Sequence, residues 1–338
     1  MTPQKIRNYT KNILHLVAGI LIIVVIVVIL QNISGYMQVQ GTPPGWTIIR
    51  PPDEVSALLI SNDTIWTGGK EGVILVNRFT GNSVRLTGAP SIGYVRQIIM
   101  DHSGTIWIGH DGGLVTYRNT SWHVIAPGPG LPFTKVLSIT ERHDGSIVIG
   151  TDSDVYSYDG LKWQSILQGA GSTIASADVL YEDRSNDLWV GCSAPLHGAL
   201  YHLQGTRWQQ FTVNDGLPHP AVRAITEDSN GTVWVATGYS RNGGAALFSH
   251  GLWTNITKAD GLAGESTRSV YQDTAGRIWV GSEYDGIAVH ANGTWNILTE
   301  KDGLAGNEVK IIKQDQNGTF WLGTNKGLSR IYVNAVMV

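Results

Sequence analysis

Four cationic side chains occupy one recurring position in the sequence, eleven residues before a tryptophan. They are Arg96, Arg223, Arg268 and Lys310. If the fold gathers them around one axis, these groups could hold the carboxylate of an anionic sugar, with arginine donating two parallel hydrogen bonds. The alternative is structural: each cation pairs with an aspartate of a neighbouring Asp-Gly-Leu loop and fixes that loop. A binding site and an internal ion pair therefore compete as explanations of one position.

A second group of candidates follows the tryptophans in glycine-rich segments that are predicted to be loops. These segments differ between repeats while the framework does not, and variation on a rigid scaffold is where binding specificity usually lies. The ligand-binding candidates are His110, Tyr239, Arg241 and Glu283. A lyase or hydrolase would instead use His110, His197, His219 and Glu283 as acid and base groups. Nothing in the spacing of that set supports a catalytic site, so we predict no catalytic residue.

The remaining composition limits other chemistry. Cys192 is the only cysteine, which excludes an intrachain disulfide and a zinc site built from thiolates. The ten histidines show no metal-ligand spacing, and the Asp-x-Asn-Gly turns lack the glutamate of a calcium loop. No Walker, H-E-x-x-H or G-x-S-x-G motif is present. We therefore predict no metal and no cofactor, and the net charge of −3 gives no reason to expect a nucleic-acid partner.

The tryptophans that define these positions belong to a repeat of 41 to 45 residues. In one repeat Val148-Ile149-Gly150 replaces the tryptophan motif, and the other six motifs begin at Trp66, Trp107, Trp189, Trp234, Trp279 and Trp321. Seven such anchors at this period, with about four short strands per unit, are typical of a β-propeller. In the three repeats without a cation, the position eleven residues before the anchor holds Val55, Leu137 or Asp178.

Each repeat can be divided into four strands. An apolar inner strand, such as residues 222–225, precedes an Asp-x-x-Gly turn that suits a type I turn. The anchor marks the second strand, and a glycine-rich loop leads to the third. A further tryptophan starts the fourth strand 15 to 19 residues after the anchor, at Trp122, Trp163, Trp208, Trp253 and Trp295. Such regular placement predicts packing between blades rather than a platform for sugars.

The two ends of the repeat array complement each other. The segment that starts at Trp46 resembles a fourth strand without the first three, whereas residues 308–333 supply three strands without a fourth. Pairing them closes the ring and removes the exposed edges of an open array. The predicted fold is therefore an all-β, seven-bladed propeller over residues 46–335, with four-stranded blades and the last blade closed by the N-terminal strand.

An apolar segment precedes the propeller. Residues 13–31 are predicted to form a transmembrane helix, because an almost uninterrupted apolar run of this length spans about 27 Å. Lys5, Arg7 and Lys11 precede it, and the next cation is Arg50, so residues 1–12 are expected in the cytoplasm. Residues 32–45 read as a linker. A cleaved signal peptide is the alternative, but no A-x-A pattern follows the run.

The last repeat carries the fullest version of the pattern. It contains Val309, Ile312, Asp315, Gly318, Trp321-Leu322-Gly323-Thr324 and Gly327-Leu328. Together with the Asp-Gly-Leu loops at 215–217, 260–262 and 302–304, it resembles the two-component regulator propeller repeat. The resemblance covers about residues 46–335 and is strongest in the last three blades. It implies the extracytoplasmic sensor of a bacterial membrane histidine kinase, often for carbohydrate-derived ligands; here we expect a stand-alone, membrane-anchored propeller without a kinase domain.

The predicted function is that of a non-catalytic, ligand-binding or sensory propeller on the outer side of a cell membrane, feeding a two-component signalling system. Its expected partners are membrane lipid through the helix at 13–31, and either a small molecule of the carbohydrate class or a protein. One alternative is a protein-interaction scaffold at the cell envelope. The other is a propeller lyase or hydrolase.

Overall fold

The computed structural model describes residues 44–128, 131–167, 176–193 and 198–332. The predicted cytoplasmic tail, the transmembrane segment at 13–31 and the linker up to residue 43 lie outside the described residues. Within the described ranges, no helix is long and apolar enough to cross a membrane. The helical elements of the described residues are three short 3-10 helices, η1 (Val213–Asp215), η2 (Lys258–Asp260) and η3 (Glu300–Asp302).

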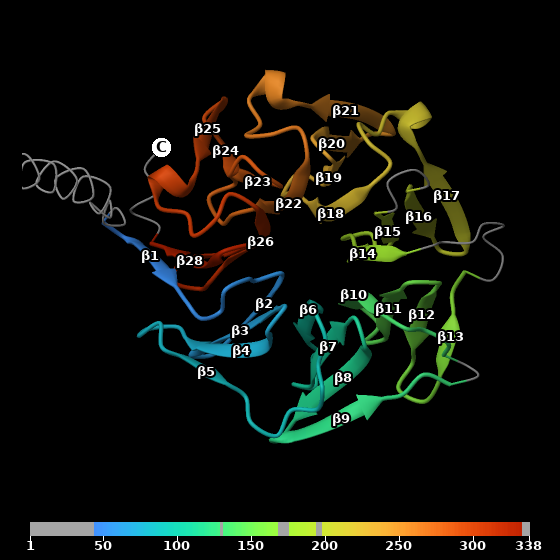
Figure 1. The fold of residues 1–338 in the computed structure, drawn as a ribbon. Helices are drawn as coiled ribbons and strands as arrows, with labels where there is room; N and C mark the ends of the chain where they lie inside the picture. Colours follow the sequence, from blue (N-terminus) through green and yellow to red (C-terminus); the bar gives the residue numbers. More distant parts are fainter. Residues whose placement is uncertain (1–43, 129–130, 168–175, 194–197, 333–338) are drawn as a thin grey trace, which may run out of the picture. The chain divides into compact units, whose positions relative to one another are not determined.

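The described part of the chain forms seven antiparallel sheets of four strands each, arranged as a ring of blades (Figure 1). The inner strands are β2 (Ala57–Ser61), β6 (Val95–Met100), β10 (Val136–Glu141), β14 (Ala177–Glu182), β18 (Val222–Glu227), β22 (Thr267–Gln272) and β26 (Val309–Gln314). The second strands are β3 (Thr64–Gly69), β7 (Ile106–His110), β11 (Ile147–Thr151), β15 (Leu188–Cys192), β19 (Val233–Tyr239), β23 (Ile278–Ser282) and β27 (Phe320–Thr324).

The third strands are β4 (Gly72–Asn77), β8 (Gly113–Arg118), β12 (Val155–Tyr158), β16 (Leu200–Gln204), β20 (Asn242–Ser249), β24 (Ile287–Ala291) and β28 (Gly327–Ile331). The outer strands are β5 (Ser83–Arg85), β9 (Ser121–Ile125), β13 (Trp163–Ser165), β17 (Arg207–Phe211), β21 (Leu252–Ile256), β25 (Thr294–Leu298) and, for blade seven, β1 (Trp46–Ile49). Each inner strand contacts that of the next blade, and β26 contacts β2. The predicted seven-bladed, all-β propeller is confirmed.

The ring closes as the sequence predicts. Strand β1 pairs antiparallel with β28, with Trp46 opposite Ile331 and Ile49 opposite Leu328. Across the same junction, the backbone amide of Val55 donates to the carbonyl oxygen of Thr324 at 2.9 Å. Blade seven is therefore completed by the segment that precedes blade one. Strand β1 covers the edge of β28 that would otherwise be unpaired.

A hydrogen bond between a turn aspartate and the anchor tryptophan recurs in five blades. The aspartate Oδ2 accepts from the indole Nε1 of the residue six positions later, in the pairs Asp101–Trp107, Asp183–Trp189, Asp228–Trp234, Asp273–Trp279 and Asp315–Trp321. The Oδ1 of the same aspartate accepts turn amides, as from Thr232 in blade five at 3.0 Å. One carboxylate thus satisfies a buried indole and fixes the turn. Blade three lacks both partners, with Arg142 and Val148 in their places.

The tryptophans also join neighbouring blades. Trp66 of blade one packs on Tyr117 of blade two, with ring centroids 5.3 Å apart, and Tyr117 packs on Trp122 at 4.8 Å. All six anchor tryptophans are at most 7% exposed. For the anchors, the predicted role in blade packing is therefore confirmed.

Asp228→Ala should lower the free energy of unfolding by about 1–3 kcal/mol, because it leaves the buried Nε1 of Trp234 without an acceptor. Urea unfolding followed by tryptophan fluorescence measures the change. The matched control is Asp144→Ala in the turn of blade three, where an exposed aspartate accepts only from Ser146 and no anchor indole is present. Equal losses in the two variants would show that the indole bond adds nothing.

Candidate functional site

Six of the seven inner strands begin with a β-bulge that holds the recurring position found in the sequence. In each, the pairing with the second strand skips one residue, and the skipped residues are Arg96, Leu137, Asp178, Arg223, Arg268 and Lys310. A bulge leaves its extra residue out of the ladder and re-aims the side chain. The same backbone irregularity therefore presents one side chain per blade to the central axis.

Blade one is the exception, and the prediction for Val55 was wrong. Its first hairpin is one residue shorter, since Trp66 pairs with Leu59 whereas Trp107 pairs with Ile99. Val55 is fully buried in the hydrophobic cluster around Trp321. Ser56 takes the place at the axis instead.

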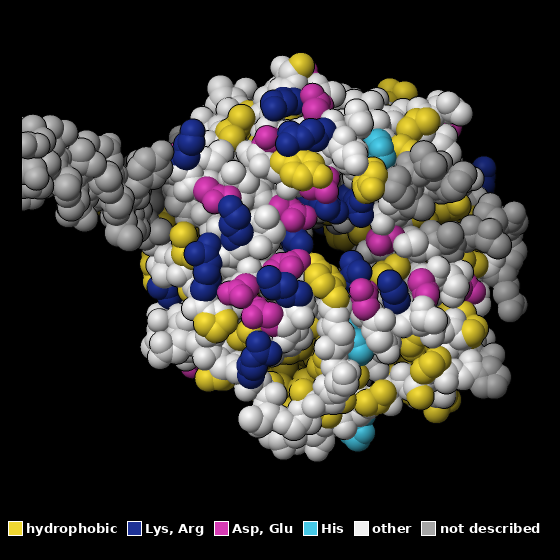
Figure 2. All heavy atoms as spheres, viewed as in Figure 1, with side chains coloured by type: hydrophobic (Ala, Val, Ile, Leu, Met, Phe, Trp, Pro, Cys, Tyr) yellow, Lys and Arg dark blue, Asp and Glu magenta, His cyan; other side chains and the backbone are white. Residues whose placement is uncertain are grey.

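The bulge residues line a cavity of about 240 Å³, which we call the mouth. Its lining is Ser56, Tyr94, Arg96, Leu137, Asp178, Arg223, Arg268, Glu308 and Lys310. The six bulge residues also line a second cavity of about 350 Å³ between the inner strands, so the two are continuous. Figure 2 shows Lys, Arg, Asp and Glu side chains side by side around a central hollow. The structure thus brings together the four cations predicted from the sequence.

Three of these cations form ion pairs with carboxylates at the mouth. Arg96 binds Asp111 through two parallel hydrogen bonds of 2.7 and 2.9 Å. Arg268 donates to Glu283 at 2.5 Å and lies 3.3 Å from Glu308. These arginines are therefore held by residues of the loop between the second and third strands of their own blades, Asp111 and Glu283.

Lys310 joins three blades. Its Nζ donates to Glu54 at 2.5 Å and to the hydroxyl of Tyr94 at 3.3 Å, and Tyr94 donates to the same carboxylate at 2.7 Å. Burial raises the pKa of Glu54, but the hydrogen bonds from Lys310 and Tyr94 outweigh it and leave the pKa below its ordinary value. Burial lowers the pKa of Lys310, yet the bond to Glu54 and the neighbouring acids leave it raised. Both groups are therefore stabilised in their charged forms.

The aspartates of the Asp-Gly-Leu loops have a different role from the one predicted. Asp215, Asp260 and Asp302 each accept hydrogen bonds from the threonine that caps the preceding 3-10 helix, in a capping box. Their carboxylates are used within their own loops. The prediction that these aspartates pair with the inner-strand cations was therefore wrong, because the pairing carboxylates come from other segments.

Arg223 differs from the other three cations. Its Nε donates to the backbone carbonyl of Gly238 at 3.2 Å, and within the described residues no carboxylate lies within ion-pair distance. Burial lowers the pKa of Arg223, and the nearby Arg268 adds to the effect. Asp178, which lines the mouth together with Glu308, accepts from the Ser176 hydroxyl and from the amide of Ser193. Arg223 is thus the one mouth cation of the described chain without a charged partner.

Three of the four loop candidates lie near one another: Glu283 and Tyr239 are close enough to Arg223 to affect its pKa, and Arg241 contacts Tyr284 beside Glu283, whereas His110 belongs to blade two. His110 is 3% exposed, and its Nδ1 accepts from the amides of Gly93 and Gly112, so it fixes two loops. Glu283 adjoins the mouth through Arg268. Tyr239 is 45% exposed on the β19–β20 hairpin, where the Arg241 guanidinium lies 4.8 Å from the centre of the Tyr284 ring.

Of the histidines in the alternative enzyme site, His110 lies in blade two and His219 precedes the inner strand of blade five. The Nδ1 of His219 accepts from the amide of Ala221, and burial lowers the pKa of His219. His197 lies outside the described residues. Sequence reasoning missed a different cluster, Asp183, Asp187 and His202, which could hold a metal ion. The only signal in the sequence was a second aspartate at the end of one turn.

The comparisons with known proteins agree with this geometry. The family model described as two component regulator propeller matches residues 216–239, 261–284 and 303–326. Each match runs from an Asp-Gly-Leu loop through the inner and second strands of blades five, six and seven. These three segments match the two component regulator propeller repeat, which confirms the resemblance. No curated protein matches the chain in sequence.

Solved structures share the fold at low identity. The extracellular domain of a putative hybrid two component system from B. thetaiotaomicron aligns with a TM-score of 0.74 and 18% identity, over 86% of this chain and 41% of that one. PorZ, a surface component of the type-IX secretion system of Porphyromonas gingivalis, gives 0.65 and 15%, over 82% and 46%. A catalytically inactive virginiamycin B lyase from Staphylococcus aureus, with quinupristin, gives 0.62 and 12%, over 85% and 98%.

Glu54→Gln should make the free energy of unfolding depend less on pH at acidic pH. The folded pKa of Glu54 lies below its ordinary value of 4.5, so its contribution is present above that pH and is lost as the pH falls through the folded pKa. The variant should lose about 1–3 kcal/mol at pH 7, and its stability should change less than that of the wild type as the pH falls from 4.5 through the folded pKa of Glu54. Chemical unfolding at several pH values measures both effects.

Lys310→Met serves as the partner variant. It removes the first donor to Glu54, so it should flatten the same part of the profile, and the double variant should add little to either single one. An unchanged pH profile in Glu54→Gln would contradict the proposed coupling.

Proposed function

We propose that this chain of two component regulator propeller repeats is a non-catalytic sensor that binds a small anionic ligand at the mouth. The observation that carries the proposal is Arg223, a charged side chain in the mouth whose nearest bonded partner is a backbone carbonyl. A buried or half-buried guanidinium without a counter-ion is disfavoured, and a ligand carboxylate would supply that counter-ion through two parallel hydrogen bonds.

The surrounding groups restrict the ligand to one small anionic unit. The mouth itself encloses about 240 Å³, room for one small unit, and it continues into the second cavity between the inner strands. Arg96, Arg268 and Lys310 are already paired with carboxylates. The mouth therefore offers an anion one cation, Arg223, rather than a ring of four. The Ser56 and Tyr94 hydroxyls in the walls already donate to the Val95 carbonyl and to Glu54, so neither has a proton left for a ligand. A carboxylated monosaccharide, or one uronic-acid end of a longer sugar, fits this arrangement.

The positions of the candidate acids and bases support binding without catalysis. His110 and His219 use Nδ1 to accept backbone amides, and Glu283 is held by Arg268 and Ser266. In the described chain, these groups are thus occupied by the scaffold rather than directed at one point in the mouth. A general base must reach the proton it removes.

We also propose that residues 13–31 anchor the propeller on the outer side of a cell membrane, where it supplies a two-component system with its input. The apolar run and the cations before it support this placement. The structural likeness to an extracellular domain of a putative hybrid two component system supports the same view.

Arg223→Ala should abolish the response of the protein to an anionic sugar. Galacturonate and glucuronate should raise the midpoint of thermal unfolding of the wild type, whereas glucose should not, because only the acids carry a carboxylate. Loss of one charge-assisted bidentate contact should weaken binding about 10- to 100-fold. Thermal unfolding and isothermal titration calorimetry measure the two effects.

Arg118→Ala, on an exposed end of β8 outside the mouth, is the matched control and should bind as the wild type does. Two results would contradict the proposal: neither uronate stabilises the wild type, or Arg223→Ala binds them with unchanged affinity.

The membrane placement has a separate test. In a bacterial host, the full chain should remain in the membrane fraction after an alkaline carbonate wash, and protease added to intact spheroplasts should degrade the propeller. Release by the wash, or protection from the protease until the cells are lysed, would argue against the anchored outward orientation.

A further inference from the structure

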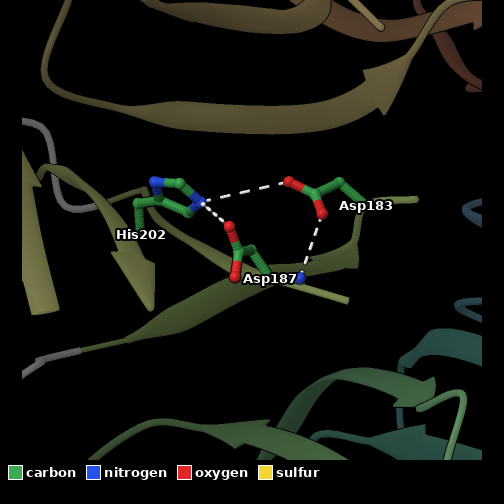
Figure 3. A group of neighbouring side chains, drawn as sticks. All are labelled: Asp183, Asp187 and His202. Carbon is green, nitrogen blue, oxygen red and sulfur yellow. Dashed lines mark hydrogen bonds and ion pairs between the residues drawn. The ribbon is translucent and has the colours of Figure 1, made fainter. Parts of the chain in front are cut away.

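Two carboxylates and an imidazole meet at the first turn of blade four, at the opposite end of β14 from the mouth. Asp183 and Asp187 belong to the β14–β15 turn, and His202 lies on β16 opposite Trp189. Figure 3 shows the His202 Nε2 directed between the two carboxylates. It lies 3.4 Å from Oδ2 of Asp187 and 3.9 Å from Oδ2 of Asp183.

The His202 Nε2 is buried without a hydrogen-bond partner. The residue is only 6% exposed, and neither carboxylate meets the geometry of a hydrogen bond to Nε2. The imidazole is stacked on the Trp189 indole, with ring centroids 3.7 Å apart and an angle of 11° between the planes. Packing therefore holds a nitrogen with a free bonding direction against two acids, an arrangement that requires a partner.

The residue four positions after the turn aspartate is a threonine in blades two, five and seven, and a cation in blade six. In blade six, Arg277 stands four residues after the turn aspartate, as Asp187 does in blade four. The Arg277 guanidinium lies over the Trp279 ring and its Nε donates to Asp273 at 2.6 Å. Blade six thus supplies its own cation beside the aspartate–tryptophan pair. Blade four replaces that cation with a second carboxylate and adds a histidine.

We propose that Asp183, Asp187 and His202 form a binding site for a divalent transition-metal ion, with Zn²⁺ as the best match. One imidazole nitrogen and two carboxylate oxygens are ligands that zinc accepts, with water completing a tetrahedron. Ligand atoms about 2.0–2.2 Å from a tetrahedral ion are about 3.3–3.5 Å apart. The 3.4 Å distance already meets this spacing, and the 3.9 Å distance needs a shift of a few tenths of an ångström.

The outer contacts of the two carboxylates suit the same ligand. The amide of Gln204 donates to Oδ2 of Asp187 at 2.9 Å, and the Trp189 indole donates to Oδ2 of Asp183 at 2.8 Å. Such outer hydrogen bonds orient the ligands of a metal.

The test uses the full chain, stripped with EDTA and dialysed, and then titrated with ZnCl₂. Isothermal titration calorimetry and elemental analysis should give one zinc ion per chain. Zinc in excess should raise the midpoint of thermal unfolding. Asp187→Asn preserves the shape of the turn but removes one charged ligand, and His202→Gln removes the nitrogen ligand. Each should weaken zinc binding by at least about ten-fold. Ca²⁺, which prefers oxygen ligands only, should bind more weakly than zinc.

His290→Ala is the matched control, because His290 also lies on the third strand of its blade and packs against a tryptophan, Trp295, with ring centroids 4.8 Å apart. It should bind zinc as the wild type does. Circular dichroism without metal confirms that each variant is folded. The proposal is overturned if the wild type takes up no zinc, if calcium binds more tightly, or if the two ligand variants bind zinc as tightly as the His290 control.

Discussion

The pairing of β1 with β28 is the constraint on which the rest of the propeller depends. It joins segments at opposite ends of the repeat array, and it places blade one against blade seven. Only across this junction can Lys310 of blade seven reach Glu54 at the start of blade one. The mouth is therefore a product of closure: no blade holds it alone, and its charges neutralise one another across blade boundaries.

The fold could be predicted from the sequence because the repeats share the same residues at the same spacing. The anchor tryptophan and the turn aspartate are linked by a hydrogen bond within one hairpin, so their fixed spacing reports local structure directly. The segment at Trp46 was identified as the missing outer strand because Trp46 matches the fourth-strand tryptophan but has no anchor before it. Val55 was misplaced because counting from Trp66 assumes equal hairpins, and the first hairpin of blade one is one residue shorter.

The site could be predicted only in part. The position of Arg96, Arg223, Arg268 and Lys310 was found, since the same bulge recurs in every one of their strands. Their partners were not, because side-chain pairs such as Lys310 with Glu54 join residues far apart in the chain, and spacing carries no record of them. The cluster at His202 was missed for the same reason: it joins a turn to a strand whose register only the fold reveals.

Amide hydrogen exchange tests the central claim, closure by residues 46–49, most directly. A closed ring predicts that the β1 amides that donate to β28 exchange as slowly as the amides of β28, because both become accessible only when the propeller opens. Peptide-resolved mass spectrometry of the full chain resolves the two strands. Exchange of 46–49 within seconds, while β27 and β28 stay protected, would show a frayed end and an open seventh blade, and would contradict the account.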